Sequence, residues 1–317
     1  MNLSKVIKSI NKLIIDSTFR FNVFSAIGLY DHMPDDRYLK KKYKVYTGRK
    51  LDLSDPKSFN EKLQWLKLYN HRSEYTVMVD KLRVRDYIEK TIGAQYLIPL
   101  IGVWDNPNEI DFGRLPNQFV LKCNHNSGTG LCVCRDKSKI NIDTVINELR
   151  KGLAQDYFIL NREWPYKDIR RKIICEEYME DTSSNSSNIN GLLDYKFYCF
   201  NGEPRFLYVG YADVRDGVKH DRMTYLDLDW HKTDFKRPDH EELSFFPVKP
   251  SDFDEMIAVA KKLSEGIPFV RIDLYNINKR IYFSEMTFFP GSGFSLFSPE
   301  EAEITLGSWI ELPKVEN

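Results

Sequence analysis

Two stretches of alternating apolar and polar residues predict antiparallel β-hairpins, and they restrict the fold more than any other feature of the sequence. Residues 194–211, DYKFYCFNGEPRFLYVGY, form two such runs joined by Asn201-Gly202, a dipeptide that favours the tight turn of a two-residue hairpin. A second pair of runs near the C-terminus predicts strands at 268–275 and 280–287. Antiparallel strand pairing is therefore expected at the centre of the fold.

Helical periodicity and capping signals predict four helices among the strands. Ser58 begins the first helix, with Glu61 three residues later as in a capping box, and Gly93 ends the second. The predicted helices cover 57–70, 75–91, about 141–152 and about 252–264, and further strands are predicted at 97–103, 118–122, 131–136 and 171–180. Because these elements alternate without regular βαβ spacing, the pattern predicts an α+β fold rather than a doubly wound sheet. The Ser/Asn-rich stretch 181–194 predicts a mobile loop.

The charge of the chain is balanced overall but not locally. Lys+Arg and Asp+Glu both total 46 in 317 residues, which argues against a dedicated nucleic-acid binder. The first fifty residues, however, hold 11 Lys/Arg and only 4 Asp/Glu. A solvated helical start and a patch for anionic lipid or an acidic polymer are both open at this point.

The first residues of the chain place apolar side chains at helical spacing, from Leu3 to Ile14. This predicts an amphipathic helix that packs on the protein or lies on a membrane surface. No apolar run reaches the roughly 18–20 residues needed to span a bilayer, and the start of the chain is not a convincing signal peptide. The five cysteines include no CxxC pair, so buried reduced thiols in a cytoplasmic protein are expected rather than a zinc site.

A lysine followed by a turn of small residues is the first candidate for chemistry. Lys122 ends a predicted strand, and a small-residue turn precedes the next strand. The turn consists of Asn126, Ser127, Gly128, Thr129 and Gly130. Glycines let backbone N–H groups approach phosphate oxygens, and an ammonium group neutralises their charge. The alternative is an ordinary hairpin that carries a lysine.

Two further candidates suggest contacts to a nucleotide. The strand ending in Glu176, Glu177, Tyr178 and Met179 could offer backbone groups to an adenine rim and a carboxylate to ribose hydroxyls; the alternative is a strand end with solvated acids. Lys81 lies in the predicted helix 75–91, where an ordinary surface lysine is the alternative.

The C-terminal hairpin predicts a group of charged residues. Asp273 and Glu285 lie on adjacent strands, and carboxylates converging from two strands are ligands that Mg²⁺ accepts while a phosphate supplies the rest. Arg271 shares the face of Asp273 and could meet a transferring phosphoryl group. Lys196 shares a face with Asp194 on its own strand and could point into the same cleft. A salt-bridged hairpin without a metal is the alternative.

Taken in order along the chain, these segments resemble the ATP-grasp superfamily, and more narrowly its TupA-like branch, which is found in surface-polysaccharide gene sets. The resemblance covers about residues 55–310, and it is carried by KSFNEKLQWLKLY, LKCNHNSGTG, DYKFYCFNGEPRF and VRIDLYNINKRIYFSEMTFFPGSGF. It implies two α+β lobes that clamp ATP between antiparallel sheets, with a helical N-terminal extension. The implied segments are an extension at 1–54, an N-terminal lobe at 55–117, a small ATP-binding lobe at 118–180 and a C-terminal lobe at 181–317.

The resemblance also implies roles for the candidate residues. Lys81 matches the first ATP lysine, near the α-phosphate, and Lys122 matches the second. The turn 126–130 matches the flexible loop over the β- and γ-phosphates, and residues 176–179 match the adenine and ribose hinge. Asp273 and Glu285 match the ligands of Mg²⁺ or Mn²⁺. Many members carry Asn two positions after that glutamate, whereas here the residue is Thr287, a weaker ligand.

The function implied is an ADP-forming ligase that joins an amine, such as an amino acid, to a carboxylate through an acylphosphate. The carboxylate would belong to a uronic acid of a capsule, O-antigen or cell-wall polysaccharide precursor, in the cytoplasm or at the inner face of the membrane. Basic residues after the first hairpin could bind such an anion: Arg205, Arg215, Lys219, His220 and Arg222. The alternatives are a kinase, a degenerate ATP-binding module, and a glycosyltransferase with Asp227-Leu228-Asp229 as its DxD motif.

Overall fold

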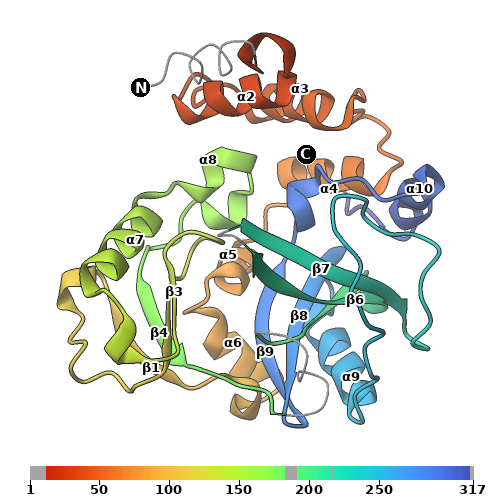
Figure 1. Ribbon diagram of the computed structural model, residues 1–317. Helices are drawn as coiled ribbons and strands as arrows, with labels where there is room; N and C mark the ends of the chain where they lie inside the picture. The colour runs from red at the N-terminus through yellow and green to blue at the C-terminus, as the bar shows by residue number, and fades with distance from the viewer. Residues whose placement is uncertain (1–11, 183–190, 216–217, 315–317) are drawn as a thin grey trace.

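The computed structural model describes residues 12–182, 191–215 and 218–314, and two antiparallel sheets dominate it (Figure 1). The strands are β1 Leu100–Trp104, β2 Phe119–Cys123, β3 Leu131–Cys134, β4 Ile173–Glu177, β5 Asp194–Phe200, β6 Glu203–Arg215, β7 Val218–Asp227, β8 Phe269–Ile277 and β9 Arg280–Thr287. The α-helices are α2 Ser17–Ala26, α3 Asp35–Thr47, α4 Phe59–Tyr69, α5 Ser73–Val79, α6 Val84–Thr91, α7 Ile142–Ala154, α8 Tyr157–Asn161, α9 Phe253–Ser264 and α10 Glu300–Ser308. Short 3₁₀ turns are η1 Ala94–Tyr96, η2 Pro107–Glu109, η3 Lys137–Lys139, η4 Trp164–Tyr166 and η5 Pro290–Gly293.

The two sheets differ in size and in the way they are connected. The small sheet has the strand order β1-β4-β2-β3, and the large sheet has the order β7-β6-β5-β8-β9. All pairs of neighbouring strands are antiparallel. The predicted α+β fold with antiparallel sheets is therefore confirmed.

Both predicted hairpins are present. The first turns at Asn201 and Gly202, whose φ angles of 50° and 83° are those that a two-residue hairpin turn requires. The second joins β8 to β9 and turns at Asn278 and Lys279, slightly later than expected. Asp273 pairs with Glu285, and only the pairs Arg271–Thr287 and Ile272–Met286 lie closer to the open end of this hairpin.

The prediction of one continuous helix over 75–91 is wrong, because the chain forms two helices there, α5 and α6. Asp80 leaves the helical conformation, with φ −75° and ψ 109°. Its carboxylate accepts hydrogen bonds from the backbone N–H of Leu82 at 2.9 Å and from the side chain of Asn124 at 2.8 Å. A partner from the small sheet thus stabilises the break, and Lys81 lies in the turn instead of on a helix.

The core follows the division into sheets. The largest apolar cluster lies on the large sheet and includes α4, α5, α6, α9 and α10, whereas a separate cluster joins the small sheet to α7. The helix predicted at residues 57–70 is confirmed as α4, whose Ser58 and Glu61 form the expected capping box. All five cysteines are free thiols, of which Cys132 is partly exposed.

Helices α2 and α3 form an outer layer above the two sheets (Figure 1). They enclose a small core of their own, built around Phe21, Tyr38 and Tyr43, and this core includes Phe294 from the loop after β9. Most of the amphipathic helix predicted near the N-terminus, and the tip of the loop predicted at 181–194, lie outside the described residues. Within the described ranges, no helix has the length and apolar character needed to cross a bilayer.

Candidate active site

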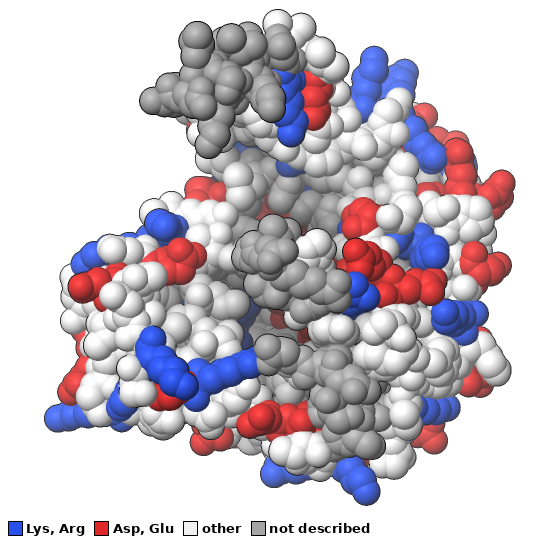
Figure 2. Space-filling model, in the orientation of Figure 1, with Lys and Arg blue, Asp and Glu red and all other residues white. Residues whose placement is uncertain are grey.

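A cavity of about 440 Å³ lies between the two sheets and collects most of the residues singled out in the sequence. Those that line it are Lys81, Lys122, Asn126, Ser127, Gly128, Thr129, Glu176, Glu177, Tyr178, Met179, Lys196 and Glu285. On the face seen in Figure 2, basic and acidic side chains are interspersed around the central part of the molecule. Together, the lining residues include members of seven strands: β2, β3, β4, β5, β6, β8 and β9.

Lys122 and Glu176 form the charged centre of the small-sheet wall. Lys122 lies on β2 and Glu176 on the adjacent β4, and the Lys122 ammonium is 2.5 Å from a Glu176 carboxylate oxygen. Arg85 of α6 approaches the other carboxylate oxygen at 3.4 Å. The Lys122 and Glu176 side chains keep 22% and 9% of their surface exposed, so both can reach the cavity. Sequence reasoning missed Arg85, because the pattern of α6 shows only an ordinary amphipathic helix.

Lys81 approaches the same centre from the turn between α5 and α6. Its ammonium donates to the backbone carbonyl of Asn126 at 2.7 Å, and its backbone N–H bonds to the carbonyl of Asn124. Burial lowers the pKa of Lys81, although Glu285 and Glu176 act in the opposite direction. Lys81 therefore lines the cavity and at the same time holds the first residue of the small-residue turn.

The small-residue turn divides into an open part and an anchored part. Ser127 and Gly128 are exposed, and a Cβ added at Gly128 would meet no atom within 4 Å. Gly130 is buried, and a Cβ there would lie 2.8 Å from the Cα of Gly152 in α7. The Asn126 side chain bonds to the carbonyl of Gly152 at 3.1 Å and so points toward α7. The sequence assigned all five residues to phosphate, but Gly130 and the side chain of Asn126 serve to dock α7.

Apolar side chains form one end of the cavity. Leu131 and Val133 of β3 expose about half of their surfaces there, at 47% and 50%. Met179 packs in a cluster with Ile98 and Tyr282 at the same boundary of the sheets. Sequence reasoning did not single out Leu131, Val133 or Ile98, although the alternation along β3 exposes every second side chain.

The large-sheet wall carries a tight cluster of charges on β5, β8 and β9. Arg271 binds Asp273 through two hydrogen bonds of 2.6 Å, and Lys196 donates to the same carboxylate at 2.6 Å. Asp273 is completely buried. Arg271 also reaches Glu285 at 3.4 Å and the hydroxyl of Thr287 at 3.0 Å. Strand register brings these groups together, since Lys196 pairs with Asp273 and Asp273 pairs with Glu285.

The electrostatics of this cluster keep Glu285 ionised. Burial alone raises the pKa of Glu285, but the charges of Lys81, Lys196 and Arg271 outweigh it and lower that pKa to about 2. Burial alone lowers the pKa of Lys196, but the carboxylates of Asp194 and Asp273 raise it well above its usual range. Glu285 and Lys196 therefore keep their charges throughout the neutral pH range. For Asp273, burial outweighs the charges of Arg271 and Lys196 and raises the pKa of its carboxyl group.

The cluster also tests the expected metal site. The facing acids do not need a metal in order to coexist, because Arg271 and Lys196 neutralise them. No group of three His, Cys, Asp or Glu side chains within the described residues is arranged to hold a metal by itself. The Glu285 side chain is nevertheless 33% exposed and lines the cavity with Asp273 next to it. Glu285 and the hydroxyl of Thr287 are oxygen donors that fit Mg²⁺ when phosphate oxygens complete its shell. The sequence also predicts Asp273 as a ligand, but its carboxylate is buried, is bound by Arg271 and Lys196, and does not line the cavity.

The remaining candidates lie away from this centre or have no described side chains. Asp227 caps a turn by accepting a hydrogen bond from the backbone N–H of His231 at 2.7 Å, and the segment 227–229 does not line the cavity. Arg222 pairs with Glu241 at 2.6 Å, and Arg205 is exposed. The side chains of residues 213–219 lie outside the described part of the chain, and with them those of Arg215 and Lys219.

Comparison with known proteins gives one family. A family model described as TupA-like ATPgrasp matches residues 61–311. A search of curated proteins finds no match to this chain.

Solved structures that resemble the chain do so at low identity. The D-alanine–D-alanine ligase of Helicobacter pylori is 13% identical with a TM-score of 0.44, and the match covers 81% of this chain and 70% of that one. The corresponding enzyme of Bacillus anthracis, complexed with ATP, is 11% identical with a TM-score of 0.37, over 67% and 54%. N5-carboxyaminoimidazole ribonucleotide synthetase of Thermus thermophilus is 11% identical with a TM-score of 0.39, over 74% and 52%. The chain thus spans about half the length of the last two proteins.

Proposed function

The chain belongs to the TupA-like ATP-grasp family, and from that premise we propose that it is an ATP-dependent carboxylate–amine ligase. The observation that carries the proposal is the single cavity between the sheets, which Lys81 and Lys122 approach from one side and Lys196 and Glu285 from the other. Two antiparallel sheets around such a cavity make up the ATP-grasp fold expected from the sequence. The division of the chain into lobes at 55, 118 and 181 stays a prediction.

The proposed nucleotide orientation follows from the polarity of the cavity. Its apolar end, with Leu131 and Val133, suits the flat face of a base, and residues 176–179 supply the adjoining strand end. Lys81 and Lys122 would neutralise the polyphosphate, and the exposed residues Ser127 and Gly128 would cover it. Glu176, which now holds Lys122, would give up part of this contact to the phosphates.

The proposed reaction has two steps. A carboxylate oxygen of the acceptor attacks the γ-phosphorus, the bond to the β-phosphate oxygen breaks, and ADP leaves. The amine then attacks the carbonyl carbon of the acylphosphate, the amine loses a proton, and inorganic phosphate leaves. Arg271 would stabilise charge on the transferring phosphoryl group, while Asp273 holds the guanidinium in place. Magnesium would be held by Glu285 and Thr287, and by Asp273 only if that carboxylate gave up a hydrogen bond from Arg271 or Lys196. The ion would supply Lewis-acid stabilisation of the same charge.

The acceptor and the cellular location are further parts of the proposal. We propose a uronic acid of a surface-polysaccharide precursor as the carboxylate and an amino acid as the amine, in the cytoplasm at the inner face of the membrane. On α3, the exposed residues Arg37, Lys40, Lys41 and Lys44 recur at spacings of three and four residues and share one face. Ile15 and Ile27, at the two ends of α2, are 83% and 71% exposed. Exposed basic residues on α3 and exposed isoleucines at the ends of the neighbouring α2 suit an anionic lipid surface, and vesicle flotation with and without anionic lipid tests this location.

One assay separates the ligase from its alternatives. The purified chain is incubated with ATP, Mg²⁺ and a panel of uronic acids and amino acids, and ADP, AMP and phosphate are measured. ADP release that requires both a carboxylate and an amine is expected. A phosphorylated product formed without an amine would indicate a kinase. Turnover of a sugar nucleotide without ATP would indicate a glycosyltransferase, and binding of ATP without hydrolysis would indicate a degenerate module, the alternative that Thr287 favours.

A further inference from the structure

Helix α4 buries a row of polar side chains where an amphipathic helix normally buries apolar ones. Asn60, Gln64 and Lys67 are separated by four and three residues, so they lie on one face of the helix. Their exposed fractions are 0%, 0% and 2%. Burying an amide or an ammonium group without partners costs several kcal/mol, so this row requires specific acceptors.

Each of the three donors binds a carbonyl of the loop that follows β9, although Asn60 also donates to the carboxylate of Glu303 in α10 at 2.9 Å. The Asn60 side-chain amide donates to the carbonyl of Ser295 at 3.0 Å, and the Gln64 amide donates to the carbonyl of Gly293 at 2.6 Å. The Lys67 ammonium donates to the carbonyl of Ser292 at 2.7 Å. Three donors on successive turns of α4 thus bind three carbonyls of one short loop, in antiparallel order.

This loop has an unusual backbone, although two hydrogen bonds lie within it, from Ser292 N–H to the carbonyl of Phe289 and from Phe294 N–H to that of Gly291. Gly291, Ser292 and Gly293 have φ angles of 56°, 54° and 64°, all in the left-handed region. Ser292 is disfavoured there, and residues in such conformations persist only where their surroundings impose them. A Cβ at Gly293 would lie 2.4 Å from the Gln64 side-chain nitrogen, so the loop and α4 fit closely. The hydrogen bonds from Asn60, Gln64 and Lys67 help to hold the loop in this conformation.

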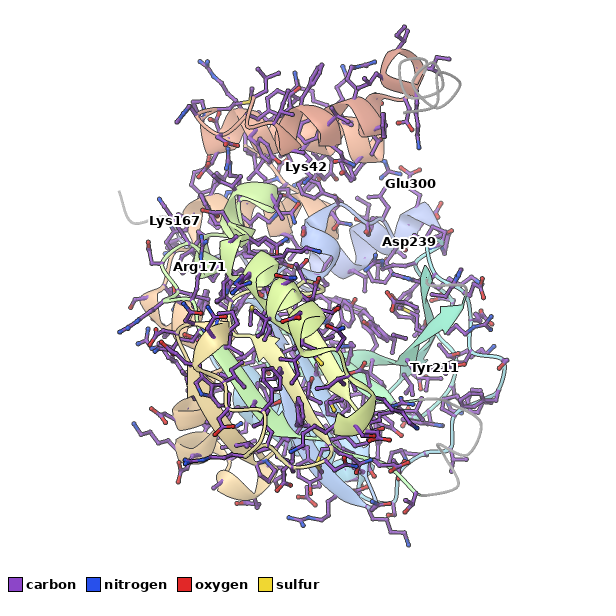
Figure 3. All side chains as sticks on the ribbon, turned by 60° about the vertical axis from the view of Figure 1, so that its left-hand side comes forward. Lys42, Lys167, Arg171, Tyr211, Asp239 and Glu300 are labelled. Carbon is purple, nitrogen blue, oxygen red and sulfur yellow. The ribbon has the colours of Figure 1, made fainter. Side chains whose placement is uncertain are left out.

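A second segment is held at the same point. The Lys67 ammonium also donates to the carbonyl of Asn161 at 3.0 Å, and the Ser292 hydroxyl donates to the carboxylate of Glu163 at 2.6 Å. From α3, Lys42 donates to the carbonyl of Leu160 at 2.7 Å, and Figure 3 shows Lys42 on the side of α3 that faces the body of the molecule. Lys67 therefore joins two chain segments, and the outer helical layer supports one of them.

The ammonium of Lys67 lies in a strongly desolvated place. It is 4.6 Å from the ring centre of Phe294 and 5.5 Å from that of Phe289. Burial lowers the pKa of Lys67 to about 7, with Glu163 acting to raise it and Lys42 to lower it. A neutral amine has two N–H donors, which match the two carbonyls that Lys67 binds. Lys67 is thus a buried hydrogen-bond donor to two chain segments and not a surface charge.

The direction of β9 places this loop relative to the reaction. Along β9, Tyr282 adjoins the apolar end of the cavity, Glu285 follows at the charged centre, and the loop begins three residues after Thr287. The loop is therefore beyond the charged centre, on the side away from the proposed base. The acceptor of an in-line phosphoryl transfer approaches from that side.

We propose that Asn60, Gln64 and Lys67 are positioning residues that fix loop 290–295 as a wall of the acceptor subsite. The proposal rests on the ligase function proposed above and deepens it. It assigns a role to the α4 segment KSFNEKLQWLKLY, which no other part of the site explains. The three residues touch neither nucleotide nor acceptor, and they act only through the loop.

The first test measures the loop itself and does not depend on activity. Amide hydrogen exchange of residues 290–295 is compared in the wild type, Lys67→Met and Gln64→Leu. Lys62→Met is the matched control, because Lys62 lies on the same helix and donates to the carbonyl of Ile310 at 2.7 Å, away from the loop. We expect exchange in the loop to rise at least about tenfold in Lys67→Met and Gln64→Leu and to stay at the wild-type rate in the control. Unchanged loop exchange in folded Lys67→Met and Gln64→Leu would overturn the proposal.

The second test separates the acceptor from ATP. In Lys67→Met we expect KM for the carboxylate to rise about tenfold, with KM for ATP within about twofold of the wild type. Equal changes in both constants would overturn the positioning role. If the wild type turns over no carboxylate at all, the ligase function fails, whereas the exchange experiment still decides whether α4 holds the loop. If Lys67→Met does not fold, as circular dichroism would reveal, Gln64→Leu supplies the same two measurements.

Discussion

The two walls of the cavity use charge in different ways. On the small sheet, Lys122 and Glu176 pair across β2 and β4 while both side chains keep some exposure to the cavity. On the large sheet, Asp273 is completely buried and held by three short hydrogen bonds from Arg271 and Lys196. The first pair can exchange partners when an anion enters, whereas the second group cannot change without leaving a buried charge unpaired.

This difference separates binding from chemistry. Lys122 is partly exposed, and Glu176, although buried, lines the cavity, so an entering anion can compete for either partner. A buried network that strand register assembles is fixed before any ligand arrives, which is what stabilising a developing charge requires. Substitutions in the buried Arg271–Asp273–Lys196 network should therefore damage both folding and turnover, whereas those of Lys122 and Glu176 should mainly affect ligand binding.

The largest effect is expected from Arg271→Met. It removes two hydrogen bonds from Asp273 and leaves that buried carboxylate with Lys196 alone, so we expect a loss of about 3–5 kcal/mol in the free energy of unfolding. Urea denaturation measures this loss. Arg205→Met is the control, since Arg205 is exposed on the same sheet. A loss below about 1 kcal/mol would mean that the large-sheet network is no more rigid than the small-sheet pair.

Glu285→Gln should separate turnover from folding within the large sheet. The Glu285 side chain is one-third exposed, and its contacts are long, 3.4 Å to Arg271 and 3.3 Å from the hydroxyl of Thr287, so less stability should be lost than in Arg271→Met. Metal-dependent turnover should fall by at least about 100-fold, because a charge that acts on the transferring phosphoryl group is removed. ADP release at saturating Mg²⁺ and ATP measures the effect, with Glu265→Gln at an exposed position as the control. Wild-type turnover in Glu285→Gln would refute the metal assignment.

Lys122→Met addresses the small-sheet wall. We expect the Kd for ATP to rise about tenfold. The free energy of unfolding should fall less than in Arg271→Met, because Glu176 keeps its contact to Arg85 and lines the cavity. Isothermal titration with ATP and urea denaturation give the two numbers. If Lys122→Met were strongly destabilised and bound ATP normally, the Lys122–Glu176 pair would serve folding and not ligand binding.

The smallest effect is expected from Thr287→Asn, which exchanges a hydroxyl for an amide oxygen beside Glu285. The Mg²⁺ concentration for half-maximal turnover should fall by about threefold, because an amide oxygen is the better ligand. A titration of turnover against Mg²⁺ measures this shift. An increase in the Mg²⁺ requirement would show instead that the hydrogen bond from Arg271 to Thr287 matters more than metal binding.

Local signals allowed much of the fold to be predicted from the sequence. The Asn201-Gly202 turn and the Ser58 capping box each depend on a few neighbouring residues, and both are present. The break at Asp80 could not be predicted, because its partner Asn124 lies 44 residues away. The polar row on α4 was missed for the same reason, since its acceptors follow β9 near the other end of the chain.

The candidate site divides in the same way. Strand periodicity correctly places Asp194 with Lys196 on one face of β5 and Arg271 with Asp273 on one face of β8, and each pair forms a salt bridge. The partners across strands depend on register, which no local pattern determines. The catalytic and ligand-binding roles of these residues stay predictions until the variants are measured.

The backbone contact between Gly130 and Gly152 has a consequence for how the cavity could close. Because there is no room for even a methyl group between them, the end of the turn at residue 130 must travel with α7 as one rigid body. The hinge of any closing motion is thereby confined to residues 127–129, where the chain is largely free of neighbours. A fluorophore on Ser127→Cys would report that motion without touching the anchor.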